Sequence, residues 1–135
     1  MIDKEIIKIA SNTENHGVLD NHTHSSKLKN AICGDEIKVY LIIQDNKILD
    51  FKYECESCIY CQASVSLLSK NAKNKSIEKF KKFAKQAINI FEKNVQSFDK
   101  EWKEFNKIIK KNNISRKECV LLPFKTVAKA LNYKL

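Results

Sequence analysis

Five cysteines, spread over a chain of 135 residues, are the side chains best suited to carry chemistry. An odd number of cysteines does not fit a simple disulfide framework, so metal or thiol chemistry is the favoured interpretation. The five come from three separate regions of the sequence, and a site built from all three must be assembled by folding. They are Cys33, Cys55, Cys58, Cys61 and Cys119.

Four side chains can converge on one centre. Gly34 lets the chain turn, so that the Cys33 thiolate and the Asp35 carboxylate can face the same point. Cys58 and Cys119 each stand near the start of an expected helix, where the helix dipole favours a thiolate. Three thiolates and a carboxylate suit tetrahedral Zn²⁺, although the cysteines could instead be small buried hydrophobes. The predicted ligands are Cys33, Asp35, Cys58 and Cys119.

The other two cysteines flank Cys58 in a Cys-x-x-Cys-x-x-Cys run. A [4Fe-4S] ferredoxin has such a run, but the Cys-Pro ending and the fourth nearby cysteine of that pattern are missing here. A redox pair of Cys58 and Cys61 is an alternative. We expect both extra cysteines to be accessory, with Cys61 three residues into a helix and Cys55 at the end of a strand.

Strands and helices must position these side chains. Their order along the sequence predicts an α+β fold, with a small antiparallel three-stranded sheet and helices packed on one face. An amphipathic helix over residues 3–10 is expected to pack one edge on a sheet. Two β-branched stretches, 37–43 and 47–53, predict a hairpin, and residues 22–29 predict an edge strand. The length suits one hydrophobic core, so we expect a single domain over residues 1–135.

The second half of the chain shows helical periodicity. One helix follows Cys58 and ends before Asn74, a residue that tolerates a left-handed cap. Ser76 is expected to cap a helix that runs through Asn94, and a further helix is expected over residues 98–111.

Pro123 decides where the last helix is expected to begin. A capping box at residues 115–118 would place Pro123 in the helix interior, at a cost of about 3 kcal/mol or more. A start near Cys119 or Val120 places it in the first turn, where its missing N–H removes no helical hydrogen bond. We therefore expect the later start, with Cys119 at a helix N-terminus.

The net charge of +9, from 25 basic and 16 acidic residues, could mark a nucleic-acid-binding module with a structural zinc. However, 24 of the basic residues are lysine, and the high content of Lys, Asn and Ile is what an AT-rich coding sequence gives. Arg116 is the one arginine. Base reading and phosphate clamping favour the arginine fork, so nucleic-acid binding is the least favoured function.

No apolar run approaches the roughly 20 residues that a membrane-spanning helix needs. Residues 1–5 mix acids and bases, whereas a secretory signal is basic and then apolar. We therefore expect a cytoplasmic protein.

Short motifs follow one another in a fixed order along the chain. They are Asn15, Gly17 and Leu19 (N-x-G-x-L), Cys33-Gly34-Asp35 (CGD), Asp50 with Cys58 (D-x7-C), Ala63-Ser64-Val65-Ser66 (ASxS), and Arg116 with Cys119 and Leu122 (RxxCxxL). Together they resemble the motifs of the SufU/IscU/NifU N-terminal family of iron-sulfur cluster assembly proteins. The resemblance extends over nearly the whole chain.

Within that family, the spacing resembles the SufU branch. The 25-residue step from Cys33 to Cys58 and the 61-residue step from Cys58 to Cys119 resemble SufU, which carries an inserted helical segment in the second interval. IscU has a histidine immediately before its last cysteine, where this chain has Glu118. The chain departs from the family at Ser57, where a glycine is usual.

The resemblance implies a zinc-dependent, sulfurtransferase-like carrier that accepts persulfide sulfur from a PLP-dependent, SufS-like cysteine desulfurase and works with other Suf components. Cys33 is then the receiving thiol. Arg116 either steers a persulfide or a partner carboxylate, or makes a structural ion pair. The alternative is an IscU-like scaffold that assembles a [2Fe-2S] cluster on the same residues.

Overall fold

The computed structural model describes residues 4–31, 34–93, 98 and 100–135, and it has three strands, four α-helices and two 3-10 helices (η). In chain order they are α1 (Lys4–Ala10), β1 (His24–Lys29), β2 (Glu36–Gln44), β3 (Lys47–Glu56), α2 (Ile59–Ala72), α3 (Ile77–Lys93), η1 (Lys100–Lys107), η2 (Lys111–Arg116) and α4 (Lys117–Ala130).

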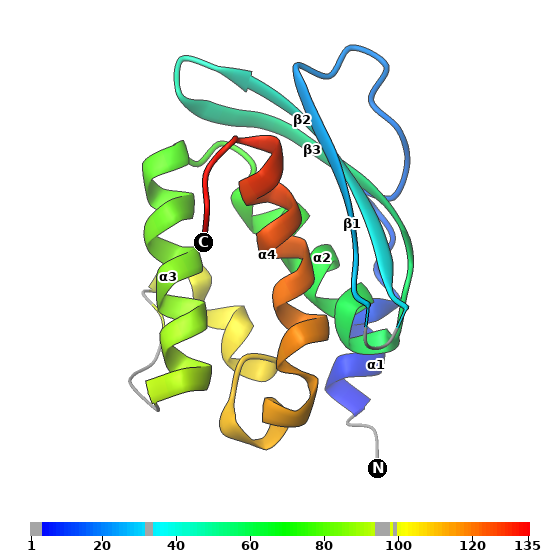
Figure 1. Cartoon of the computed structure of the whole chain (residues 1–135), viewed down its shortest axis with the longest axis vertical. Helices are drawn as coiled ribbons and strands as arrows, with labels where there is room; N and C mark the ends of the chain where they lie inside the picture. The colour runs from blue at the N-terminus through cyan, green and yellow to red at the C-terminus, as the bar shows by residue number, and fades with distance from the viewer. Residues whose placement is uncertain (1–3, 32–33, 94–97, 99) are drawn as a thin grey trace.

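The three strands form one antiparallel sheet in the order β1-β2-β3, which confirms the predicted α+β fold. Helices α2 and α4 pack against one face of this sheet, and α3 stands beside α4 (Figure 1). None of the helices in the described parts of the chain is long and apolar enough to cross a membrane.

The hairpin of β2 and β3 closes through a two-residue turn. Asp45 and Asn46 both have positive φ, 53° and 62°, the backbone that a type I′ turn requires. Alternate residues of β2 are fully buried, namely Ile37, Val39 and Leu41. In β3, Ile48 and Phe51 are fully buried but three positions apart, because the pairing of the two strands shifts register between Ile42 and Ile43. Exposure also alternates along β1, as expected for an edge strand.

Two helix boundaries agree with the predictions, whereas the packing of α1 does not. Asn74 has φ 68° and ends the α2 segment, and the Ser76 hydroxyl accepts the Lys79 N–H at 3.1 Å as an N-cap of α3. Helix α1 packs mainly against α2 and not on the sheet, with Ile6 fully buried.

The single helix predicted over residues 98–111 is wrong, because this stretch forms the 3-10 helix η1 and then a turn. The buried residues Trp102, Phe105 and Ile108 are three positions apart. That spacing keeps them on one side of a helix with three residues per turn.

The predicted start of the last helix is also wrong, because α4 begins at Lys117 and has Pro123 in its interior. The segment η2 runs directly into α4, and the Lys117 N–H donates to the Ile114 carbonyl. Most residues from Cys119 to Ala128 are buried, and this burial offsets the local cost of the proline. Cys119 still lies in the first turn.

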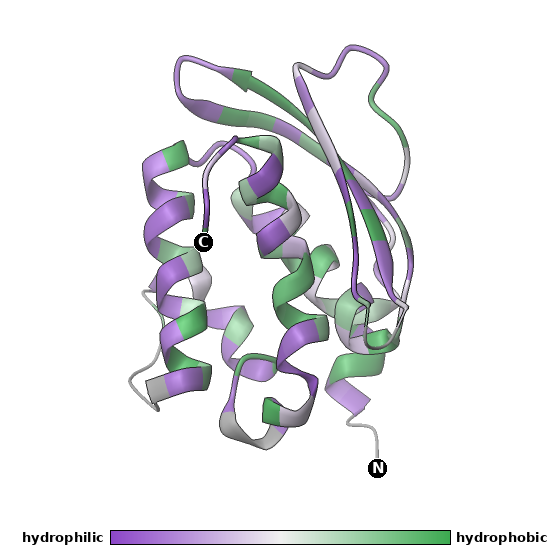
Figure 2. Cartoon of the chain, viewed as in Figure 1, coloured by the Kyte–Doolittle hydropathy of each residue, from purple (hydrophilic) through white to green (hydrophobic). Residues whose placement is uncertain are grey.

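An aromatic cluster joins α3, η1 and α4. The Phe83 ring stacks on Trp102, with ring centroids 3.9 Å apart and an interplanar angle of 4°. It also contacts Phe98, Phe105 and Phe124. In Figure 2, purple and green alternate along α3, whereas much of α4 is green, so α4 forms the centre of the helical layer.

Replacing Phe83 with alanine should lower the free energy of unfolding by about 3 to 5 kcal/mol, because the ring is buried and contacts four other aromatic rings. Urea denaturation followed by circular dichroism measures this loss. Leu49→Ala, at a side chain that is 39% exposed, is the control and should change stability by less than about 1 kcal/mol. Equal losses in the two variants would contradict the role given to the cluster.

Candidate metal centre

Three predicted ligands lie together where the sheet meets the starts of two helices. Asp35 precedes β2, Cys58 is the N-cap of α2, and Cys119 lies in the first turn of α4. One ligand atom from each residue lies within 4.8 Å of the others. Asp35 and Cys119 are buried and Cys58 is half-buried. The fourth predicted ligand, Cys33, falls outside the described residues.

Backbone geometry holds the Asp35 carboxylate against the start of α2. Gly34 has φ 76°, the left-handed conformation that glycine favours, as the predicted bend requires. The amide of Asn30 donates to the Asp35 carbonyl at 2.7 Å and closes this bend. The Cys58 N–H then donates to Asp35 Oδ1 at 2.9 Å. A carboxylate at a helix N-terminus is also favoured by the helix dipole.

The second carboxylate oxygen, Asp35 Oδ2, is buried and has no hydrogen-bond partner among the described residues. Leaving a charged acceptor unsatisfied costs about 1 to 3 kcal/mol or more. A cation bound between this oxygen and the two thiols would satisfy it. The set of one carboxylate and two thiols, with a third thiol two positions before Asp35 in sequence, therefore fits tetrahedral zinc.

Without a bound cation, the pKa of Cys58 is higher than the helix-dipole prediction implies. Burial raises the pKa of Cys58, and the neighbouring Asp35 raises it further. The backbone N–H of Cys61 and the Cys119 thiol lower it, but burial outweighs them. The prediction of a dipole-lowered pKa is therefore wrong for Cys58 without a bound cation, because desolvation disfavours the thiolate. A bound cation reverses this balance.

Cys55 and Cys61 lie where the sequence predicts, near the end of β3 and three residues into α2. Cys61 is fully buried, and this burial raises its pKa well above the ordinary thiol range. Burial also raises the pKa of the half-buried Cys55. Among the described cysteines no pair forms a disulfide, and neither of these two joins the Asp35, Cys58 and Cys119 group. A buried thiol with a raised pKa disfavours a redox role for Cys61.

Arg116 lies at the junction of η2 and α4, three residues before Cys119. Its guanidinium is exposed and lies over the Tyr60 ring, 5.4 Å from the ring centroid. No ion pair joins Arg116 to a described acidic side chain, so the structural ion pair that the sequence left open is not seen there. Tyr60 was not predicted. An aromatic residue two positions after Cys58 was its only signal in the sequence.

Other motif residues belong to a polar network that contains none of the three converging ligands. Lys73 Nζ donates to Asn15 Oδ1 at 2.6 Å and lies 3.3 Å from Asp50 Oδ1. Asn15 in turn donates to the Ser69 hydroxyl at 3.2 Å. Asp50 therefore joins β3, α2 and the loop after α1, and its spacing from Cys58 does not reflect a shared ligand role.

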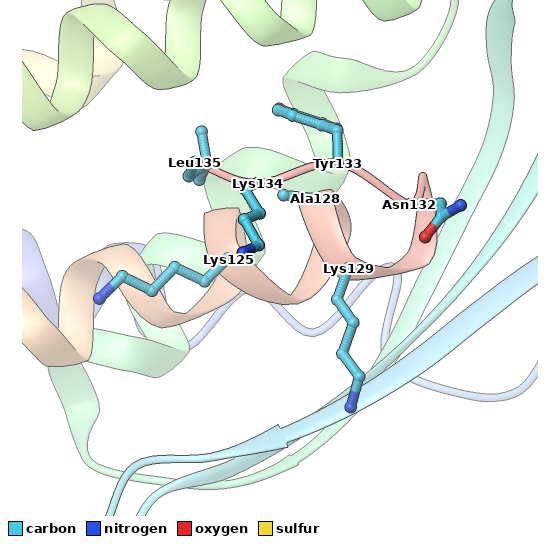
Figure 3. A pocket seen from close by; sticks show the side chains of 7 residues that line it. All are labelled: Lys125, Ala128, Lys129, Asn132, Tyr133, Lys134 and Leu135. Atoms are coloured by element: carbon cyan, nitrogen blue, oxygen red, sulfur yellow. The ribbon is translucent and has the colours of Figure 1, made fainter.

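An open hollow of about 560 Å³ lies at the opposite end of α4 from Cys119 (Figure 3). Two of the lysines that line it already have partners. Lys125 pairs with Glu118 at 2.9 Å, and Lys129 donates to the Lys27 carbonyl at 3.0 Å. No cysteine, histidine or acidic side chain is among the described residues that line it. This hollow therefore offers no metal ligand of these types, and the candidate functional site is the group of Asp35, Cys58 and Cys119.

Comparisons with known proteins show which family this chain resembles. The family of NifU-like N-terminal domains matches residues 1–104. The iron-sulfur cluster assembly scaffold protein IscU of Thermotoga maritima is 31% identical over 134 residues, which cover 97% of this chain and 92% of that protein. The zinc-dependent sulfurtransferase SufU of Bacillus subtilis is 34% identical over 67 residues, or 50% of this chain and 45% of that protein.

Solved structures share the fold. A protein of Fervidobacterium islandicum, described as an iron-sulfur cluster assembly scaffold for the SUF system, is 28% identical with a TM-score of 0.86, over 97% of this chain and 96% of that one. A NifU-like N-terminal domain from Brucella abortus has a TM-score of 0.89 at 22% identity, over 96% and 90% of the two chains, a likeness of fold alone. By the match of more than half its length and by this similarity to its relatives, the chain belongs to the family of NifU-like N-terminal domains.

Proposed function

We propose that this chain is an iron-sulfur cluster assembly protein of the IscU/SufU type, acting in the cytoplasm as one domain over residues 1–135. The observation that carries the proposal is the convergence of Asp35, Cys58 and Cys119, with a buried carboxylate oxygen that has no hydrogen-bond partner in the described part of the chain. Cys33 is proposed as the fourth metal ligand. Membership of the family and the names of the relatives support this function.

The finer proposal is a zinc-dependent acceptor of persulfide sulfur. Glu118 stands where IscU proteins have a histidine, and the long interval between Cys58 and Cys119 also resembles SufU. The name of the Bacillus relative supports this assignment, although that match covers half of the chain. The proposed sulfur donor is a SufS-like, PLP-dependent cysteine desulfurase, and other Suf components are the further partners.

In the proposed transfer, the Cys33 thiolate attacks the outer sulfur of a persulfide on the desulfurase. A bond forms between Cys33 Sγ and that sulfur, the sulfur-sulfur bond of the donor breaks, and the desulfurase cysteine leaves as a thiolate. No external oxidant or reductant is consumed. A bound zinc supplies the positive charge that keeps the ligand thiols deprotonated.

Arg116 is proposed to assist the approach of the donor. The Tyr60 ring supports its guanidinium, which remains exposed close in sequence to Cys119. A planar cation held in this way can pair with a carboxylate or a persulfide anion of the partner. We therefore assign Arg116 to the catalytic residues together with Cys33.

A scaffold that assembles a [2Fe-2S] cluster on the same residues is the second candidate. The Thermotoga relative that matches almost the full chain carries the scaffold name, and thiolate-rich tetrahedral sites suit iron as well as zinc. Nucleic-acid binding is not proposed, because base reading and phosphate clamping favour the arginine fork and this sequence has a single arginine.

Alanine at Cys33, Cys58 or Cys119 should abolish the binding of about one zinc per chain and lower the melting temperature, because the binding energy of a coordinated ion contributes to folding. Elemental analysis and calorimetry of the purified variants measure both effects. Cys55→Ala is the matched control and should retain zinc. Full zinc occupancy in Cys119→Ala would overturn the ligand assignment.

Two replacements of Asp35 should separate capping from metal binding. Asp35→Asn keeps an acceptor for the Cys58 N–H but loses the charge, so it should fold normally and bind zinc more weakly. Asp35→Ala should open a coordination position without unfolding the domain. After anaerobic loading with iron and sulfide, a colourless Asp35→Ala protein that holds zinc supports the sulfur acceptor, whereas stable visible absorption from a cluster supports the scaffold.

The unmodified protein should raise the cysteine turnover of a SufS-like desulfurase, and Cys33→Ala should remove the effect because it removes the receiving thiol. Arg116→Ala should reduce the stimulation less severely, mainly by weakening association. Alanine and sulfide production in the presence of a reductant measure turnover, with Cys55→Ala as the control. Full stimulation by Cys33→Ala would show that another thiol receives the sulfur.

A further inference from the structure

A buried hydrogen bond joins the two helices that carry the described thiols. The Ser64 hydroxyl, on α2, donates to the backbone carbonyl of Val120, on α4, at 2.6 Å. Ser64 and Val120 are both fully buried. Each partner is rigidly connected to a thiol, since Cys58 is the N-cap of the helix that carries Ser64, and Cys119 directly precedes Val120.

The first turns of α4 depend on such a contact more than those of an ordinary helix. Pro123 has no N–H to donate to the Cys119 carbonyl four residues earlier, and its ring crowds that carbonyl. Position 123 of α4 therefore donates no helical hydrogen bond. A donor from a neighbouring helix can restrain the backbone at the turn that the proline weakens.

We propose that Ser64 is a positioning residue of the metal centre, which sets the separation of the Cys58 and Cys119 thiols by tying α2 to the first turns of α4. Ser64 makes no contact with the metal in this proposal and acts through the Val120 carbonyl. The consequence for metal affinity rests on the proposed function, whereas the consequence for the separation of the thiols does not.

The same helix offers a matched control. The Ser66 hydroxyl is also buried, and it donates to a backbone carbonyl, that of Asn12, at 2.8 Å. Asn12 lies in the loop after α1, outside the metal centre. Alanine at Ser64 or at Ser66 thus removes the same chemical group from α2 and leaves one carbonyl without its hydroxyl donor, but only Ser64 is tied to the helix with Cys119.

The first measurement is metal binding. Competition with a chromophoric chelator gives the zinc affinity, and the absorption of the Co²⁺-substituted protein reports thiolate ligation and geometry. Ser64→Ala should bind zinc at least tenfold more weakly than Ser66→Ala and should show weakened thiolate-to-cobalt absorption, because supporting hydrogen bonds around a metal centre typically contribute about 10- to 100-fold in affinity. Ser66→Ala should keep the spectrum of the unmodified protein.

The second measurement needs no metal. Metal-free protein is treated with the thiol oxidant diamide, and mass spectrometry follows the peptide in which Cys58 and Cys119 are joined by a disulfide. Ser64→Ala should form this link at a rate at least threefold lower than the unmodified protein, whereas Ser66→Ala should match the unmodified rate. If the unmodified protein binds no metal, the proposed function fails while this measurement still tests Ser64.

A second pair of variants tests the role of the hydroxyl if Ser64→Ala does not fold. Ser64→Thr and Ser64→Val have nearly equal volume and differ in the hydroxyl, so the threonine variant should form the link faster and, if metal binds, hold it more tightly. Equal behaviour of Ser64→Ala and Ser66→Ala in both measurements, or of the threonine and valine variants, would overturn the positioning role.

Discussion

The hydrogen bond from the Cys58 amide to one oxygen of Asp35 is the interaction on which the metal centre depends. It links the loop before β2 to the start of α2, where the Asp35 carboxylate lies close to the Cys58 and Cys119 thiols. The second carboxylate oxygen is buried and has no hydrogen-bond partner among the described residues. A buried carboxylate left in this state is unfavourable by itself. The buried carboxylate therefore lowers the stability of the fold when no cation is bound, and a bound cation would offset this cost.

Burial and charge act against each other around these thiols. In the metal-free chain, burial raises the pKa of Cys58, so the protonated thiol is the preferred form, although the start of a helix favours the thiolate. Metal binding must then release protons, and the affinity for metal rises with pH. The same burial makes Cys61 a small hydrophobic residue of the core, despite its position in the Cys-x-x-Cys-x-x-Cys run.

The serines of α2 hydrogen-bond to different neighbouring elements. Ser64 ties α2 to α4, while Ser66 and Ser69 tie it to the segment after α1. Lys73 extends this second set of contacts to Asp50 on β3. The helix and its C-cap thus connect α4, the segment after α1, and β3. The serine hydrogen bonds are buried, where a low local dielectric strengthens them, whereas the ion pair of Lys73 and Asp50 is partly exposed.

The sequence by itself determined the features that depend on local pattern. The β-branched stretches predicted the hairpin, and the residue types Cys33, Asp35, Cys58 and Cys119 predicted a candidate metal site, of which the fold brings Asp35, Cys58 and Cys119 together. Only the tertiary structure decided the start of α4, because the burial of most residues from Cys119 to Ala128 outweighed a local proline penalty of about 3 kcal/mol. It also decided the thiol pKa, since desolvation depends on neighbours distant in sequence.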